Sequence, residues 1–278
     1  MPRINVMLDK KIISQYKKCI QANQIGEAKE LLLEHTTDDA LIYKYFRGTN
    51  RDVSAIMKNE LWMANAAMFN DPYECAFLKG VSQRKYSKEE SKKALEEYIA
   101  QRDEDARSLR RQSSLFVMCF SELNKSIPMW GYYAGDHKGL CVGYRVKRLI
   151  KKYNCFPVIY SDRMPATRDD NHYMEQALTK SKQWSHEKEW RIVNHCPQNQ
   201  GQSGFLFSFV EPSVILLGCR FEENESIIAN DRKKIREIKE SMPCHFAVIS
   251  DYHIKSGVKL EILYRDRESF ELCEKRVK

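Results

Sequence analysis

The chain has 278 residues, 42% of them hydrophobic and 30% charged, which is enough apolar content for a packed core and too little charge bias for disorder. Its net charge of +8 favours anionic partners such as nucleic acid or a phosphorylated ligand, although acids are interspersed among the basic residues. No apolar run reaches the roughly 20 residues of a membrane span, and none of the nine cysteines forms a Cys-x-x-Cys pair. We therefore expect a cytoplasmic protein without membrane contact, a disulfide framework or structural zinc.

The predicted elements begin with two short amphipathic helices at residues 9–36, so residues 1–40 are treated as a helical N-terminal extension of a single α+β domain at residues 41–278. Strands are predicted at residues 41–46, 61–64, 115–120, 139–144, 156–160, 187–194, 205–209, 214–217, 245–249 and 259–264. Helices are predicted from Thr49 or Asn50 onward and at residues 87–112, 127–134, 147–152, 170–184 and 223–240. The irregular alternation of the two favours one mixed α+β domain.

The first candidate site feature is Arg47-Gly48-Thr49, where a predicted strand ends and a helix begins at once. The backbone N–H groups at that helix start, with Arg47 beside them, would suit an anionic or ribose-bearing ligand. The alternative is an ordinary strand–turn–helix with an exposed arginine, and the residues alone favour this second interpretation.

The second feature is the turn Phe69-Asn70-Asp71-Pro72, whose polar side chains can bond the backbone. We favour a structural role for this turn. With His137 and Glu189, its Asp71 and the following Glu74 would also provide the ligand set of a metal-dependent nuclease, which is the weakest of our alternatives. The seven histidines show no metal-ligand spacing, so no metal is expected.

The densest signal lies at residues 129–139, where Trp130, Tyr133 and His137 are spaced i, i+3 and i+7. They share one face if the helix continues to His137, although Gly135 interrupts the pattern. Aromatic rings beside an imidazole could sandwich a flat heterocycle and hydrogen-bond its edge. The alternative is that Trp130 and Tyr133 pack in the core and that His137 is a structural histidine.

The fourth feature is the predicted strand that contains Glu187, Glu189 and Arg191, which would point to one face while Trp190 and Ile192 point to the other. Two carboxylates beside a guanidinium would be unusual packing unless this face lines a cleft. Paired carboxylates can position a hydroxyl nucleophile and stabilise an oxocarbenium-like centre. The alternative is a ladder of ion pairs on the surface.

Together these motifs resemble a widespread prokaryotic family of unknown function. The resemblance covers about residues 41–220 and rests on Phe69-Asn70-Asp71-Pro72, Cys119-Phe120-Ser121, Met129-Trp130 with Tyr133, His137 and Gly139, and Trp184 with Glu187, Glu189 and Arg191. A more distant resemblance links residues 45–64 to the opening of the ADP-ribosyltransferase fold, in which a strand ends in His or Arg and an Asn-starting helix follows. The order Arg47, Ser121 and Glu187-Lys188-Glu189 is similar to one branch of that superfamily, and Tyr133 with Glu189 to the other.

The second resemblance implies a mainly antiparallel sheet, with inserted helices, and an enzyme that transfers ADP-ribose from NAD to a macromolecular acceptor. It implies that Glu189 stabilises the ribosyl cation, that Glu187 orients the acceptor and that Arg191 holds both carboxylates. The residues implied in NAD binding are Arg47, Thr49, Ser121, Trp130, Tyr133 and His137. We accordingly expect these groups to converge on one cavity wide enough for a dinucleotide. A role as a toxin or a phage-defence effector is also implied.

The partners expected from this reading are a nucleic-acid or protein acceptor and, through the helices at residues 9–36, an antitoxin or a second copy of the chain. Those helices could equally cap the sheet. The main alternative is a non-enzymatic module that binds nucleic acid or a protein partner through its basic surface, and a steep loss of binding with salt would favour it.

Overall fold

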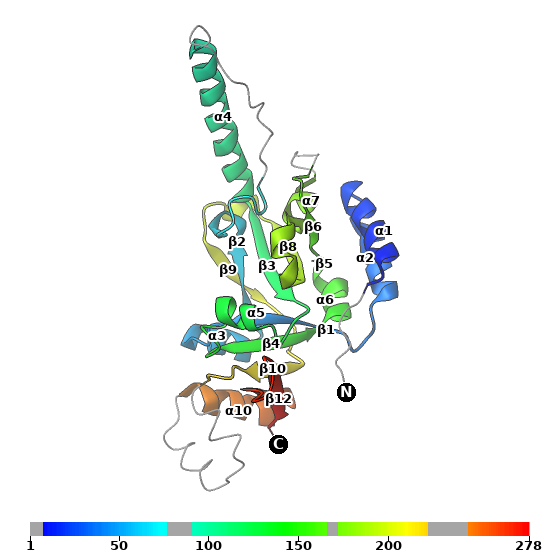
Figure 1. The fold of residues 1–278 in the computed structure, drawn as a ribbon, viewed down its shortest axis with the longest axis vertical. Helices are drawn as coiled ribbons and strands as arrows, with labels where there is room; N and C mark the ends of the chain where they lie inside the picture. The colour runs from blue at the N-terminus through cyan, green and yellow to red at the C-terminus, as the bar shows by residue number, and fades with distance from the viewer. Residues whose placement is uncertain (1–7, 77–90, 166–171, 222–243, 278) are drawn as a thin grey trace.

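Two groups of strands that meet at a single residue pair form the centre of the protein. The structure is a computed structural model that describes residues 8–76, 91–165, 172–221 and 244–277. Strands β1 (Leu41–Phe46) and β3 (Leu115–Ser121) are paired only at Tyr43 and Ser121. Figure 1 shows that β1, β4 and β10 run across the direction of β2 and β3. The sheet therefore opens on either side of the Tyr43–Ser121 pair.

The strand order confirms the mixed, mainly antiparallel sheet. One group runs β12 (Leu272–Arg276), β11 (Lys259–Arg265), β10 (Val214–Leu217), β4 (Leu140–Arg145) and β1; the other contains β9 (Gly204–Ser208), β2 (Glu60–Asn65), β3, β8 (Glu189–His195) and β5 (Cys155–Pro157). Within this sheet β10 and β11 are parallel, and the other recorded pairs are antiparallel. Strands β6 (Ile159–Ser161) and β7 (Thr179–Ser181) form a separate parallel pair.

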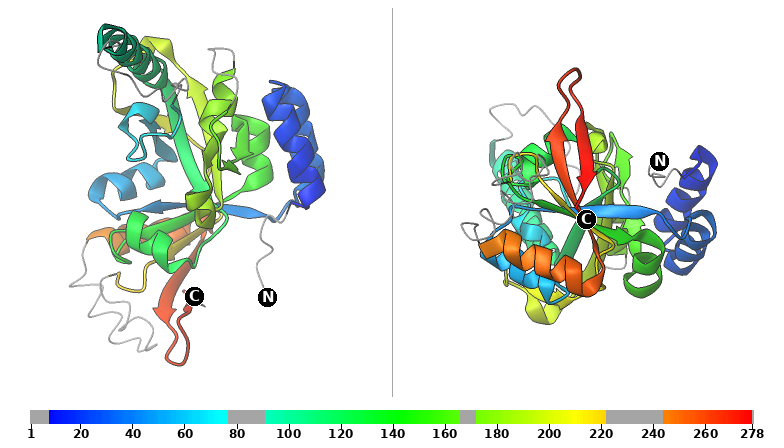
Figure 2. Two further views of the ribbon diagram at one scale, coloured as in Figure 1. Left: turned by 45° about the horizontal axis from the view of Figure 1, so that its top comes forward. Right: turned by 90° about the horizontal axis from the view of Figure 1, so that it is seen from below.

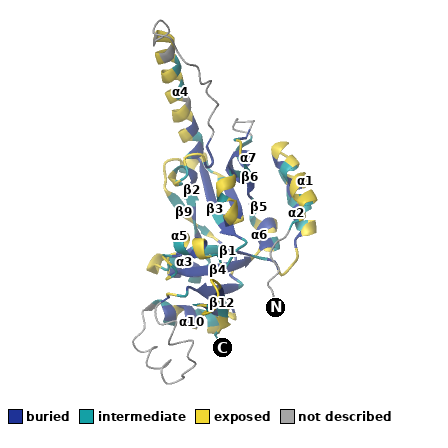
Figure 3. Cartoon of the chain, in the orientation of Figure 1, coloured by how far each residue is buried: buried dark blue, intermediate teal, exposed yellow. Residues whose placement is uncertain are grey.

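The helices pack around these strands. Helices α3 (Asn50–Met57) and α10 (Cys244–Ser256) contact each other, and α5 (Ile127–Tyr133) contacts β1. Helix α4 (Ser91–Gln112) projects away from the sheet, and its outer part is exposed (Figures 1 and 3). The central strands are buried by comparison, as Figure 3 shows. Within the described ranges, no helix combines the length and the apolar composition that a membrane crossing requires.

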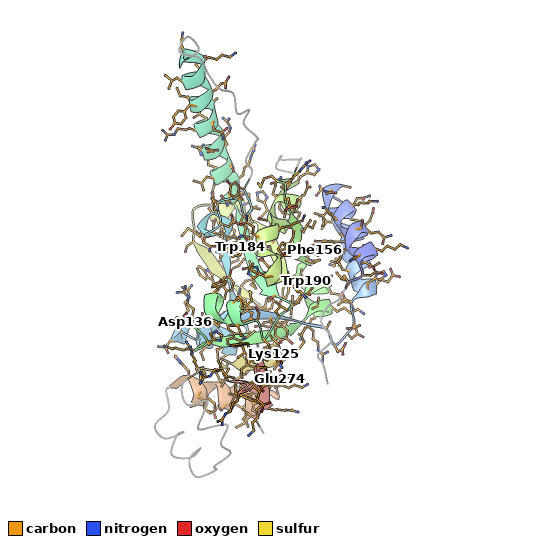
Figure 4. The ribbon with its side chains drawn as sticks, in the orientation of Figure 1. Lys125, Asp136, Phe156, Trp184, Trp190 and Glu274 are labelled. Atoms are coloured by element: carbon orange, nitrogen blue, oxygen red, sulfur yellow. The ribbon has the colours of Figure 1, made fainter. Side chains whose placement is uncertain are left out.

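The N-terminal extension forms two helices, α1 (Lys10–Gln21) and α2 (Ile25–His35), as predicted. Helix α2 packs on α6 (Val146–Tyr153), while α1 lies against β5. Tyr16 of α1 is buried, stacks on Phe156 with ring centroids 6.2 Å apart, and donates its hydroxyl proton to the carbonyl oxygen of Pro157 at 2.8 Å. Figure 2 shows both helices beside the sheet, and Phe156 is labelled in Figure 4.

The pH dependence of stability should reveal the docking of α1. Burial raises the pKa of Tyr16 well above that of free tyrosine, so its contribution to stability is complete below the unfolded-state pKa of about 10 and is lost as the pH rises above it. We expect the free energy of unfolding of wild type to exceed that of Tyr16→Phe by about 1 kcal/mol at neutral pH, the net value of one hydrogen bond. This difference in free energy should shrink above pH ~10. Urea unfolding at several pH values measures it, and a difference independent of pH would contradict this assignment.

Several predicted elements differ from the structure. The segment at residues 245–249 belongs to helix α10 rather than to a strand, and the predicted strand at 156–160 is divided between β5 and β6. The predicted helix at 170–184 contains α7 (Tyr173–Leu178), β7 and the 3-10 helix η4 (Lys182–Glu187). Short apolar runs do not distinguish a strand from a buried helix, which explains the first error. The predicted helix at 223–240 lies outside the described residues.

Candidate functional site

A pocket of about 170 Å³ lies where β1 and β3 diverge. Its walls come from β1, β3, α5, the turn after β2, β7, η4 and the start of β8. The side chains are mainly aromatic on one part of the wall and charged on another. The lining residues used below are Phe69, Glu74, Ser121, Tyr133, Lys180, Trp184, Glu187 and Glu189.

Arg191 lies behind the charged wall: it is completely buried and does not itself line the pocket, but it binds two of the carboxylates that do. Its Nε donates to Glu189 Oε1 at 2.7 Å and its Nη2 to Glu189 Oε2 at 3.0 Å, so that the pair is bidentate. Nη2 also contacts Glu74 Oε1, and Nη1 donates to the carbonyl oxygen of Ala177 at 2.6 Å. The expected association of Arg191 with the carboxylates is thus present, but the second carboxylate on Arg191 is Glu74 rather than Glu187.

Lys180 joins the two predicted carboxylates. Its Nζ lies 2.6 Å from Glu187 Oε2, 2.9 Å from Glu189 Oε2 and 3.6 Å from Glu74 Oε1. Glu187 Oε1 accepts a 2.6 Å hydrogen bond from the Tyr133 hydroxyl. Glu189 is therefore neutralised by Lys180 and by the Nε–Nη2 edge of Arg191, whereas Glu187 pairs with one cation and one neutral hydroxyl.

The ionisation states follow from these contacts. Burial by itself would raise the pKa of Glu189, but Arg191 and Lys180 outweigh it and hold that pKa well below its usual range. Burial raises the pKa of Glu74, and Arg191 only partly offsets the effect. Burial would lower the pKa of Lys180, but Glu189 and Glu74 outweigh it and raise that pKa. The pKa of Tyr133 is raised by burial and then by its bond to Glu187, so this hydroxyl remains a donor.

A tight turn brings Glu187 into the pocket. Glu187 ends the 3-10 helix η4, and Lys188 follows in the left-handed conformation with φ 45° before β8 begins at Glu189. The prediction that one strand starts at Glu187 is therefore wrong by two residues. Both glutamate side chains nevertheless reach the pocket. They do so because of the left-handed turn at Lys188, and not because residues two apart in a strand point to the same face.

Trp184 forms part of the aromatic wall. Its Nε1 donates to Asp71 Oδ2 at 2.9 Å, and its ring lies 5.2 Å from the Lys180 Nζ. Asp71 Oδ1 also accepts from the backbone N–H of Tyr73 at 2.9 Å. The turn at Asp71 thus has the structural role that we favoured, and it also fixes one wall of the pocket.

Ser121 lines the pocket but is already hydrogen-bonded. It is buried, and its hydroxyl donates to the backbone carbonyl of Glu187 at 2.6 Å while accepting from the N–H of Leu123 at 3.0 Å. Ser121 therefore fixes the backbone that carries Glu187. A direct contact with NAD would require this hydroxyl to exchange its partners.

Arg47 and Thr49 lie outside this pocket. The Arg47 side chain is exposed, and its backbone passes Gly135, where an added Cβ would lie 3.2 Å from the Arg47 carbonyl oxygen. Thr49 is the N-cap of α3: its hydroxyl accepts from the N–H of Asp52, and the Asp52 carboxylate accepts from the N–H of Thr49. A carboxylate thus already occupies the helix start at which an anionic ligand was expected.

Replacing Thr49 tests this structural role. We expect Thr49→Ala to lower the free energy of unfolding by about 1 kcal/mol, because the N-cap hydrogen bond is lost. Thr49→Ser should restore most of that stability. Urea unfolding followed by circular dichroism gives both free energies of unfolding. Full stability in the alanine variant together with weaker binding of NAD would instead indicate that Thr49 binds the ligand.

Trp130 and His137 also lie outside the pocket, whereas Tyr133 lines it. Helix α5 ends at Tyr133 and does not continue to His137, which has φ 69°. Trp130 is completely buried, donates from Nε1 to the carbonyl oxygen of Asn124 at 2.8 Å, and stacks on His137 with centroids 6.5 Å apart. His137 lines a different cavity with Cys219, so these rings do not flank the carboxylates.

A metal site receives no support from this donor set. The described part of the chain contains no group of three or more His, Cys, Asp and Glu side chains that could hold an ion. The oxygens of Glu74 and Glu189 are paired with Lys180 and Arg191 instead. The ligands suggested for a metal-dependent nuclease are also divided, because His137 faces another cavity.

Sequence reasoning missed Lys180, which lay within a predicted helix where a lysine is normally exposed. It also missed the role of Tyr160, whose hydroxyl accepts from the Glu189 N–H at 2.8 Å. The need for a second cation could have been inferred, because buried carboxylates require positive partners. Arg191 alone cannot neutralise Glu187, Glu189 and a further carboxylate. No local pattern identifies Tyr160.

Comparison with models of known protein families gave a match to part of the chain. Residues 129–192 match the model of a family described as a protein of unknown function, DUF2971. The match confirms, for this segment, the predicted resemblance to a family of unknown function, and the segment contains Tyr133, Lys180 and the residues from Glu187 to Arg191. Neither the curated proteins nor the solved structures contained a match.

Proposed function

We propose that the pocket binds the nicotinamide–ribose end of NAD and that the protein is an ADP-ribosyltransferase-like enzyme. The main supporting observation is that Glu187 and Glu189 line one pocket together with aromatic side chains, at the junction of the two strand groups. A carboxylate stabilises the positive charge that develops on ribose when nicotinamide leaves, and aromatic faces suit a flat, cationic ring.

The contacts favour Glu187 as the carboxylate that faces the reacting ribose. Arg191 and Lys180 neutralise Glu189, whereas Glu187 shares Lys180 and accepts its other bond from the uncharged Tyr133 hydroxyl. Glu187 therefore retains more of its negative charge for a developing cation. This gives Glu187 the role of stabilising the ribosyl cation, which the resemblance implied for Glu189, in addition to its role toward the acceptor.

The reaction would break the glycosidic bond between nicotinamide and ribose, and the bonding electrons would leave with nicotinamide. An acceptor nucleophile would then bond to the ribose carbon and lose its proton to Glu187. Tyr133 would hold Glu187 in place through its 2.6 Å hydrogen bond. Trp184 and Phe69, which line the pocket, would pack on the nicotinamide.

The size of the pocket limits what it can enclose. Its volume of about 170 Å³ is below the roughly 300 to 1,000 Å³ of pockets that bury a whole drug-sized ligand. The expected cavity for a complete dinucleotide is thus not formed, and the adenosine diphosphate part of NAD would extend along the surface. Arg47 is exposed and could contact it only there.

The test is incubation of the purified protein with a cell lysate and NAD labelled in its adenylate part. We expect release of nicotinamide and transfer of label, and digestion with nuclease or protease would identify the acceptor as nucleic acid or protein. No nicotinamide release and no transfer would reject the proposal. Salt-sensitive nucleic-acid binding without NAD turnover would favour the non-enzymatic alternative, and EDTA-sensitive cleavage would favour the nuclease.

A further inference from the structure

Another cavity lies beside the Glu187–Glu189 turn, and helix α1 forms one of its walls. It measures about 500 Å³ and is lined by Ile13, Tyr16 and Lys17 of α1, by residues 157–160, and by Ser185, Lys188 and Glu189. Glu189 lines both this cavity and the smaller pocket. Helix α1 and Glu189 therefore border the same cavity.

Residues 158–160 hold the backbone of Glu189 from both sides. The N–H of Glu189 donates to the Tyr160 hydroxyl oxygen at 2.8 Å, and the carbonyl oxygen of Glu189 accepts from the N–H of Val158 at 2.9 Å. The first of these bonds depends on a side chain, whereas the second belongs to the backbone. A single hydroxyl thus fixes the amide at which the turn becomes strand β8.

Burial and then the charge of Glu189 raise the pKa of Tyr160, so its hydroxyl is uncharged at neutral pH. Its oxygen therefore accepts from the Glu189 amide as an ordinary phenol. This bond matters to both glutamates, because Lys188 separates them in a left-handed turn that offers few alternative conformations.

The segment that carries Tyr160 is in turn anchored by α1. Tyr16 donates to the Pro157 carbonyl oxygen at 2.8 Å, and Pro157 pairs with Trp190 of β8 in the sheet register. A continuous set of contacts therefore leads from α1 through residues 157–160 to Glu189.

We propose that Tyr160 is a positioning residue for the Glu187–Glu189 turn and that α1 supports it through Tyr16. The N-terminal helices then form part of the active-site structure rather than a separate docking module. This inference rests on the proposed function for its effect on catalysis, but its structural half can be tested without any substrate.

The catalytic test compares Tyr160→Phe with wild type in nicotinamide release. Loss of the hydroxyl should lower kcat by about tenfold to a hundredfold, because small displacements of reacting groups have effects of this size. The KM for NAD should be unchanged, since the groups that bind the nicotinamide are retained. Tyr153→Phe is the matched control: its hydroxyl bonds the Ser208 carbonyl oxygen away from the pocket, and it should keep the wild-type kcat.

The structural test is hydrogen exchange of the Glu189 amide in the full-length chain. Tyr160→Phe should accelerate this exchange strongly, Tyr16→Phe should accelerate it less, and Tyr153→Phe should leave it unchanged. Unchanged exchange in Tyr160→Phe, or a wild-type kcat in an active enzyme, would overturn the inference. If wild type does not turn over NAD, the proposed function fails, while the exchange result still decides whether Tyr160 holds the turn.

Discussion

Replacing Arg191 by methionine is expected to lower the free energy of unfolding by about 3 to 5 kcal/mol, because removing one partner from a buried ion cluster leaves an uncompensated charge. Arg191 is completely buried and bonds Glu189 through two nitrogens, 2.7 and 3.0 Å from the carboxylate oxygens. It also contacts Glu74. Without Arg191, Lys180 would be the remaining cation in contact with both carboxylates within the described structure.

Two further variants distinguish charge from shape. Arg191→Lys keeps the charge but loses the planar fork, so an intermediate loss of stability is expected. Adding Glu189→Gln to Arg191→Met removes one of the unpaired charges and should recover part of the stability. The matched surface control is Lys182→Met, which breaks an exposed ion pair with Asp162 and should change stability by less than about 1 kcal/mol.

Urea unfolding followed by circular dichroism measures the free energy of unfolding of these four variants relative to wild type. If Arg191→Met cost no more than the Lys182 variant, the buried cluster would not stabilise the fold as its geometry indicates. A large loss without any recovery in the double variant would instead attribute the effect to the 2.6 Å bond from Arg191 to the Ala177 carbonyl.

Glu187→Gln is expected to lower the rate of nicotinamide release by about a hundred- to a thousandfold, the range for removing one preorganised electrostatic group. The amide has the same shape and can still accept from Tyr133, but it carries no charge for the ribosyl cation. Its fold should remain intact, because Lys180 keeps Glu189 and Glu74 as charged partners and none of the recorded Arg191 contacts involves Glu187. Glu187 is thus a cleaner test than Glu189, whose loss would also disturb Arg191.

Glu175→Gln is the matched control for this substitution. Glu175 is also a buried glutamate, on helix α7, but it lies outside the pocket. Its variant should release nicotinamide at the wild-type rate. Thermal unfolding of both variants shows whether any loss of rate reflects the fold, and a folded Glu187→Gln with wild-type activity would reject the role of this carboxylate.

The amphipathic N-terminal helices, the strand at residues 41–46 and the helix capped by Thr49 could be predicted because their signals are local. Hydrophobic periodicity marks α1 and α2, and the Thr49 and Asp52 side chains lie three residues apart as a capping box requires. The proximity of Glu187 to Glu189 was also anticipated, although the reason given for it was wrong. A left-handed Lys188, and not one continuous strand, brings Glu187 into place.

The sequence by itself determined the mixed α+β character and singled out Tyr133, Glu187 and Glu189, because periodicity and clustered charge are properties of neighbouring residues. Only the tertiary structure decided that Lys180 and Glu74 join these glutamates, and that Arg47, Trp130 and His137 do not. The pocket around these side chains lies where the two strand groups cross at Tyr43 and Ser121. Glu74 lies 117 residues before Arg191 in the chain, and Lys180, only seven residues before Glu187, reaches it through the fold of β7 and η4, so no local pattern encodes either contact.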